Sequence, residues 1–326
     1  MASLKAVSRI TSRRVIYASI AGDFLIGATK FAAAYLTGSS AMLSEGMHSI
    51  VDTGNGFLVL YGMRRAARRP DHEHPLGYGR EIYFWSFVVA VLLFAVGAGI
   101  SLYQGAEQVL NPKPVQNVAV NYGVLALSML FDGTTWVLAL RNFKGGKRYS
   151  QLFKAIRDSK DPPSFIVLFE DTAALLGLLI AFAGIFLSVR LDLPVLDGVA
   201  SLLIGLVLAV TAALLARETK SLLIGEPADK AIVDSITQLS VRMPGVANAN
   251  GMLAVHLAPR EVLIALSLEF ADELRTPQIE AKVAELEACV RKLHPEVVAI
   301  FIKPQTAIGY KETVARRFGQ DGTKRQ

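Results

Sequence analysis

The chain has 326 residues, of which 52% are hydrophobic and 19% are charged, and its mean hydropathy of +0.40 is too high for a soluble domain of this length, so composition indicates a membrane protein. The net charge of +6 comes from Lys and Arg in the N-terminus and in alternate loops, as membrane orientation requires, so we expect no nucleic-acid partner. The single Cys289 excludes an internal disulfide framework and a cysteine-rich metal site.

Six apolar segments follow a basic N-terminal tail at residues 1–14. Each is close to the roughly 20 residues that an α-helix needs to cross the hydrocarbon core. The first segment has no small-residue cleavage site, so we interpret it as a span and not as a removed signal peptide. We predict an all-α, six-helix transmembrane domain over residues 15–216, with spans at about 15–36, 41–63, 82–103, 118–140, 165–189 and 194–215.

The loop charges predict how these spans are oriented. Lys and Arg are concentrated in the N-terminal tail, in the loop after the second span and in the long loop at 141–164. The intervening loops carry almost only Lys113 and Arg190. Because basic loops stay on the cytoplasmic side, we predict that both termini are cytoplasmic, in a bacterial inner (plasma) membrane.

Beyond Arg217 the sequence changes to that of a small soluble domain. Its predicted elements are a helix at 228–243, strands at 246–256 and 261–270, a helix that begins at Thr276 and a strand at 297–303. This αββαβ pattern predicts a two-layer α+β domain over 217–307, with helices on one face of a small sheet. Residues 308–326 are polar, and we expect a disordered tail.

The second and fifth spans carry ionisable side chains. His48 and Asp52 are four residues apart and Glu45 is three before His48, so the three share one helix face, while the fifth span carries Glu170 and Asp171. A charged group at the bilayer centre costs roughly 2.5–3.5 kcal/mol, so such residues usually line a pathway or a site. Imidazole and carboxylates suit tetrahedral Zn²⁺, and we predict a metal site between the two helices. The alternative is that these residues only make hydrogen bonds between helices.

Four other charged residues lie within predicted spans. Asp23 and Asp132 could line an access path or serve as structural partners between helices. Asp197 lies near the end of its span, where solvation is easy, and the Lys30 ammonium could reach the outer membrane surface.

The loop after the second span carries carboxylates and imidazoles, among them Asp71 and His74. These could form a surface metal-capture patch, because such ligands suit a labile divalent ion. The alternative is a solvated turn before Pro75, since sequence neighbours cannot all reach one centre.

Several motifs together resemble the cation diffusion facilitator family. They are TGS at 37–39, LSEGMHS at 43–49 followed by Asp52, HPLGYGR at 74–80, and Asp171, and the segment EDTAALLG at 170–177 is similar to the branch that contains the mitochondrial zinc exporter. The resemblance covers nearly the whole chain. It implies a homodimer of six-span protomers in the lipid bilayer, each with a ferredoxin-like cytoplasmic domain, that exports Zn²⁺ or a similar ion against an inward flow of protons.

The resemblance also implies a transport site of two residues four apart in each of the second and fifth spans. His48 and Asp52 match it in the second span, but in the fifth only Asp171 matches, because the position four before it is Val167. Glu170, Glu45 or water would then complete the coordination shell.

The family's other metal positions are only partly present. Asp71 and His74 match its loop site, while Tyr78 stands where a histidine is often found. In the soluble domain, Ser267 and the run 300–303 lack the ligands with which some members bind regulatory zinc. The resemblance therefore implies dimerisation by this domain without metal sensing.

We expect a divalent-cation efflux transporter that works as a metal/proton antiporter by alternating access. Zn²⁺ is the favoured substrate, although Mn²⁺, Fe²⁺, Co²⁺ or Ni²⁺ would accept similar ligands. His48 is the expected coupling group, because a protonated imidazole cannot bind metal. No nucleophile or general base accompanies the cluster, so we expect no enzyme. The alternative function is a membrane-anchored metal-sensing or partner-docking protein whose soluble domain carries the activity.

Overall fold

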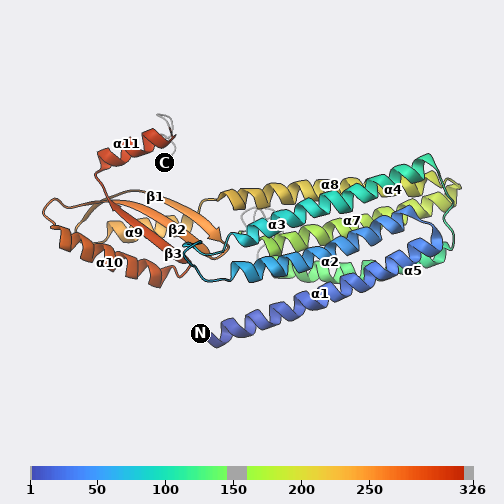
Figure 1. The fold of residues 1–326 in the computed structure, drawn as a ribbon, viewed down its shortest axis with the longest axis horizontal. Helices are drawn as coiled ribbons and strands as arrows, with labels where there is room; N and C mark the ends of the chain where they lie inside the picture. Colours follow the sequence, from blue (N-terminus) through green and yellow to red (C-terminus); the bar gives the residue numbers. More distant parts are fainter. Residues whose placement is uncertain (1, 145–159, 319–326) are drawn as a thin grey trace. The chain divides into compact units, whose positions relative to one another are not determined.

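The computed structural model describes residues 2–144 and 160–318, which form two compact units (Figure 1). The helical unit contains the chain up to Arg68 and from Glu81 to Lys220. The mixed unit contains Arg69–Arg80 and the chain from Ser221 onward. The division therefore lies beyond the boundary that composition predicts at residue 216, and the loop between the second and third spans belongs to the mixed unit.

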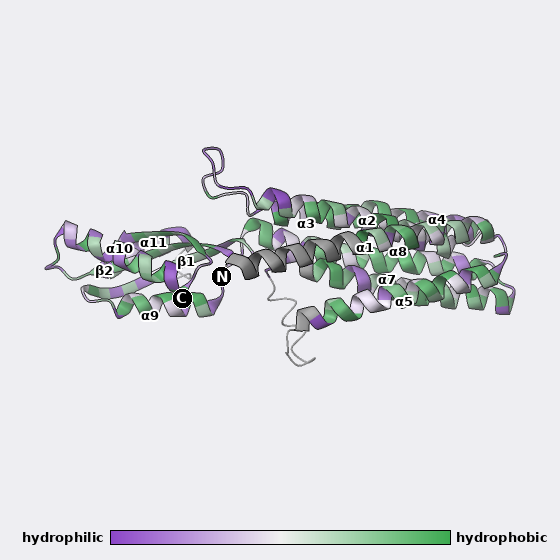
Figure 2. Cartoon of the chain, turned by 90° about the horizontal axis from the view of Figure 1, so that it is seen from below, coloured by the Kyte–Doolittle hydropathy of each residue, from purple (hydrophilic) through white to green (hydrophobic). Residues whose placement is uncertain are grey.

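Long helices build the helical unit, and every predicted span lies in them, which confirms the predicted class of fold. The elements are α1 (Ala2–Thr37), α2 (Ser40–Ala66), α3 (Glu81–Leu92), the π-helix η1 (Leu93–Ala98), α4 (Gly99–Leu110), α5 (Val118–Lys144), α7 (Pro162–Leu191) and α8 (Val195–Ile224). Figure 2 shows hydrophobic residues along most of their length. Helices suit this environment because each satisfies its own backbone hydrogen bonds.

Four helical segments of the described chain are long and apolar enough to cross a membrane: Glu81–Leu110, Val118–Arg141, Phe165–Leu191 and Val195–Ile224. The first two predicted spans lie in α1 and α2, which are also long but carry more polar residues. The basic loop predicted at 141–164 falls largely on residues 145–159, outside the described part of the chain.

Two details of the helices differ from the sequence expectation. The third span is one apolar run in the sequence, but six of its residues, Leu93–Ala98, form the π-helix η1 between α3 and α4. The sixth span continues as α8 to Ile224 instead of ending near residue 215. Apolar composition predicts that a segment is helical, but it does not reveal a widened turn within the helix.

Small residues allow α4 and α8 to approach closely. A Cβ atom added at Gly105 of α4 would lie 2.9 Å from the carbonyl oxygen of Gly198 and 2.7 Å from the backbone nitrogen of Leu202, both in α8. A larger residue at position 105 would therefore push the helices apart. Close backbone contact of this kind is typical of helices packed within a membrane.

Asp197 is fully buried and connects the beginning of α8 to the beginning of α2, which corrects the expectation that it is solvated. Its carboxylate accepts hydrogen bonds from Ser39 Oγ at 2.7 Å, Ser40 N at 2.6 Å and Ser40 Oγ at 2.9 Å. Ser39 is also the N-cap of α2 and accepts from Met42 N at 3.2 Å. Asp197 thus satisfies donors that the first turn of a helix leaves free.

The mixed unit has the predicted αββαβ order. Its elements are α9 (Lys230–Val241), β1 (Val246–Ala258), β2 (Glu261–Phe270), α10 (Thr276–Leu293), β3 (Val297–Pro304) and α11 (Ala307–Phe318). The sheet has the order β1-β2-β3, in which β1 pairs antiparallel and β3 pairs parallel with β2. The parallel pair is joined by α10, as a parallel crossover requires.

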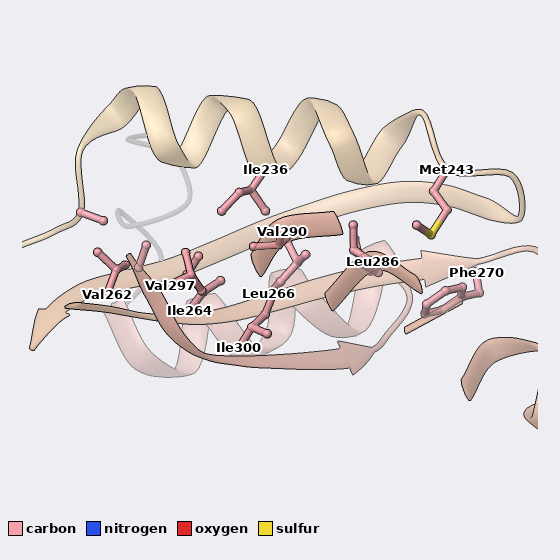
Figure 3. Close-up of a cluster of buried hydrophobic side chains, with 13 residues drawn as sticks. Ile236, Met243, Val262, Ile264, Leu266, Phe270, Leu286, Val290, Val297 and Ile300 are labelled. Atoms are coloured by element: carbon pink, nitrogen blue, oxygen red, sulfur yellow. The ribbon is translucent and has the colours of Figure 1, made fainter. Parts of the chain in front are cut away.

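One face of this sheet packs against α9 and α10 (Figure 3). Alternate residues of β2, including Val262 and Ile264, are fully buried, as are Ile236 of α9 and Leu286 of α10. Burial contributes roughly 25 cal/mol for each Å² of apolar surface, so this layer is the main source of the mixed unit's stability.

Helix α11 corrects the expectation of a disordered tail from residue 308, because the chain is helical to Phe318; residues 319–326 lie outside the described part. A Cβ atom at Gly251 of β1 would overlap the ring of Tyr310 in α11, so this glycine makes room for the helix. Just before α11, the Gln305 carbonyl oxygen accepts from Asn250 Nδ2 of β1 at 2.7 Å.

The Asp197 network yields a prediction about stability. Asp197→Ala leaves the backbone N–H of Ser40 and the hydroxyl of Ser39 without their carboxylate acceptor, and we expect a loss of about 3 kcal/mol in the stability of the helical unit. Thermal melting in detergent measures it. Asp229→Ala, which removes an exposed N-cap of α9 in the mixed unit, is the control and should leave the melting of the helical unit unchanged. Equal melting of Asp197→Ala and the unmodified protein would contradict the prediction.

Candidate metal site

The predicted stripe of ionisable residues lies on the buried part of α2. His48 is 1% exposed, and its Nδ1 atom is 3.4 Å from Asp52 Oδ1, the (i, i+4) contact that the sequence spacing predicts. The contact lacks hydrogen-bond geometry, because neither ring nitrogen of His48 nor Oδ1 of Asp52 has a hydrogen-bond partner. A neutral imidazole has an available lone pair on one of its ring nitrogens, so His48 and Asp52 each offer an atom that a cation could use.

The second group of predicted ligands lies on α7. Glu170 is buried and accepts a hydrogen bond of 2.6 Å from Asn55 Nδ2 of α2. Asp171 is partly buried, and its Oδ2 atom has no hydrogen-bond partner. Asp52 has Glu170 as an electrostatic neighbour, so the acidic residues of α2 and α7 lie in one region.

Asp23 and Asp132, whose roles the sequence leaves open, lie in the same region as the predicted ligands. Asp171 has Asp23 of α1 and Asp132 of α5 as electrostatic neighbours. Four helices thus bring carboxylates toward one another within the bundle. In the described part of the chain, no three His, Cys, Asp or Glu side chains are close enough to hold one ion, so the four-ligand centre stays a prediction.

Asn55 was not identified from the sequence. It lies three residues after Asp52 and seven after His48, so helical spacing places it on the stripe, but an amide gives no signal on its own. Its partner Glu170 is 115 positions away, and only the fold shows this pairing. Val167 stands where the family pattern has a ligand, one turn before Asp171, and its side chain is 45% exposed.

Glu45, the less certain ligand on α2, is bound to a buried lysine. Lys30 Nζ lies 3.1 Å from Glu45 Oε2, and it donates to Ser49 Oγ at 3.0 Å. Its distance to Asp132 Oδ2 is 3.8 Å. The lysine side chain is 1% exposed, so the expectation that its ammonium reaches the membrane surface is wrong: paired carboxylates solvate it inside the bundle.

The loop residues Asp71 and His74 are about half exposed, and His74 Nδ1 lies 3.8 Å from Asp71 Oδ1. The Tyr78 hydroxyl donates to Asp71 Oδ2 at 2.6 Å, and its ring centroid lies 4.3 Å from that of His74. This hydrogen bond and the backbone N–H of His74 hold the pKa of Asp71 below its ordinary value. Asp71 and His74 are the residues that the sequence suggests for metal capture, and Tyr78 already occupies one carboxylate oxygen of Asp71.

Comparisons with known proteins support a common ancestry. Residues 16–224 match the family described as the cation efflux transmembrane domain. The mitochondrial proton-coupled zinc antiporter SLC30A9 of Homo sapiens is 31% identical over 243 residues, which cover 74% of this chain and 43% of that protein. Metal tolerance protein C4 of Arabidopsis thaliana is 31% identical over 222 residues, which cover 67% of this chain and 48% of that protein. The chain thus spans less than half the length of both relatives.

The loop geometry predicts a change in a titration. Tyr78→Phe keeps a ring beside His74 but removes the hydroxyl, so we expect the pKa of Asp71 to rise toward its ordinary value. Because the folded loop lowers this pKa, its stabilising effect is present above the ordinary value and is lost as pH falls through the folded value. NMR titration of labelled aspartate carboxyl carbons measures the shift. Tyr35→Phe, at an exposed position, is the control; an unchanged Asp71 in Tyr78→Phe would refute the assignment.

Proposed function

Since this chain is an integral membrane protein that belongs to the cation efflux family, we propose that it transports divalent metal cations, with Zn²⁺ as its substrate and protons as the counter-ion. One observation carries the proposal. His48, Asp52 and Asp171 have buried nitrogen or oxygen atoms without hydrogen-bond partners inside the helical unit. Such atoms are costly to bury unless a ligand uses them.

The chemistry of these residues suits zinc. An imidazole nitrogen and carboxylate oxygens are common Zn²⁺ ligands, and two carboxylates neutralise the ion in a medium of low dielectric constant. Glu170 is our candidate for the fourth ligand, because only one of its oxygens is occupied by Asn55. Water is the alternative. Glu45 is less suited, because the positive charge of Lys30, 3.1 Å from its Oε2 atom, repels a cation that approaches this carboxylate.

Mn²⁺, Fe²⁺, Co²⁺ and Ni²⁺ accept similar ligands, so a competition series of these ions in a reconstituted flux assay tests the choice of zinc. The name of the human relative states that it is a proton-coupled zinc antiporter, which favours the same ion and counter-ion here. The relatives whose names state a function are not described as enzymes, and we propose none for this chain.

The proposed cycle alternates the access of one site between the two sides of the membrane. The ion binds His48, Asp52 and Asp171 from one side, and rocking of the helices then exposes the site to the other side. Protons complete the cycle by competing for the ligands. His48 is suited to this coupling because a protonated imidazole has no lone pair for the metal.

We also propose that the protein is a homodimer joined through its mixed unit. Leu253, Ala265 and Phe301 form a row across β1, β2 and β3 on the face opposite α9 and α10, and Phe301 is 60% exposed. The alternating basic loops favour cytoplasmic termini in a bacterial inner membrane.

The transport proposal has a direct test. Asp52→Ala or Asp171→Ala removes a carboxylate ligand, and we expect Zn²⁺-driven proton flux in proteoliposomes to fall to the level of empty liposomes. Asp192→Asn, which removes an exposed charge at the C-cap of α7, is the matched control and should retain full flux. Full transport by either site variant would sink the proposed site, and no metal flux by the unmodified protein would sink the proposed function.

A further inference from the structure

Lys30 is the feature that the transport mechanism leaves unexplained. Among the residues whose burial the structure describes, it is the one buried Lys or Arg, and its ammonium lies within 4 Å of two carboxylates from different helices. We propose that Lys30 is a positioning residue that sets the charge of the transport site, keeping Glu45 away from the ion and weakening ion binding so that the ion can be released. This inference rests on the proposed function.

The first step in the argument is the position of the charge. Lys30 comes from α1 and contacts Glu45 and Ser49 of α2, on the two turns that also carry His48. Asp52 and His48 are both electrostatic neighbours of Lys30. The fixed positive charge therefore acts on the residues proposed to bind the metal. Water does not screen it, because the lysine, Glu45 and His48 are each at most 1% exposed.

The second step concerns Glu45. Its Oε2 atom is held by Lys30 at 3.1 Å, and a Cβ atom added at Gly177 of α7 would overlap its Oε1 atom. The carboxylate is thus confined between the α1 lysine and the backbone of α7. Without the lysine, Glu45 would add an uncompensated carboxylate one turn before His48, on the stripe that also carries Asp52. An additional carboxylate would bind a divalent cation more tightly and release it more slowly.

A purely structural role for the pair makes a different prediction. Breaking a buried ion pair by removing one partner destabilises a protein, whichever partner is removed, while removing both partners is often tolerated. A structural pair would therefore lower the amount of folded protein in both single variants but leave the KM for Zn²⁺ unchanged. A charge-setting pair moves the KM in opposite directions in the two single variants.

The experiment measures Zn²⁺ flux and KM in proteoliposomes, normalised to the amount of folded, monodisperse protein. Flux by the unmodified protein establishes the transport activity first. We expect Lys30→Met to lower the KM about tenfold and to lower kcat, and Glu45→Gln to raise the KM about tenfold. The double variant Lys30→Met/Glu45→Gln keeps the net charge of the site, so its KM should return to the original value. Lys30→Arg keeps the charge and should also keep the KM.

The proposal is supported if the KM for Zn²⁺ shifts in opposite directions in the two single variants and returns to its original value in the double variant. Shifts of the same sign, or no shift, overturn it while leaving the proposed transport function intact. If Lys30→Met does not fold, the comparison of Glu45→Gln with the double variant decides, because only a charge-setting lysine makes the second substitution restore the KM.

Discussion

The cost of burying charge inside a membrane is the constraint on which the helical unit depends. Its helices carry acids on α1, α2, α5, α7 and α8, and each must gain a partner or remain costly. The structure meets this cost in different ways. Asp197 accepts hydrogen bonds from the beginning of α2, and Glu45 pairs with Lys30. Atoms of His48, Asp52 and Asp171 remain without hydrogen-bond partners. In the proposed site the unpaired atoms belong to one imidazole and two carboxylates, whereas Asp197 and Lys30 act as internal supports of the bundle.

The paired and unpaired groups are arranged along one helix. At its N-cap, Ser39, α2 contacts Asp197, and about one and a half turns later it carries Glu45, which is bound to Lys30. His48 and Asp52 follow, and then Asn55, which donates to Glu170. Each step along this helix faces a different neighbour: α8, then α1, then α7. The proposed site is therefore held by three helix contacts on one element, and a movement of α2 against any of these helices would alter the surroundings of the proposed metal ligands.

Local patterns in the sequence predicted much of this architecture. Apolar length located the spans, alternation located the strands of the mixed unit, and the spacing of His48 and Asp52 placed them on one face. What could not be predicted depends on contacts between distant positions. Ser40 and Asp197 are 157 residues apart, so neither the burial of Asp197 nor its role as a cap has a local signal. Lys30 was assigned to the membrane surface for the same reason, because its acidic partners come from other helices. The polar end of the chain was expected to be disordered because composition does not reveal the place that Gly251 leaves for Tyr310.

The π-helix η1 affects which residues of the third span point toward α8. Among the buried residues of η1 and α4, Leu93, Gly97, Ser101 and Gly105 follow one another in steps of four, and Ala98 and Gln108 are buried beside this row. An α-helix turns by about 100° per residue, so each such step would drift by about 40° around the axis. A π-turn is wider and absorbs an additional residue. The small residues of η1 and α4 can therefore keep facing α8, as the approach of Gly97 to Leu208 and of Gly105 to Gly198 shows.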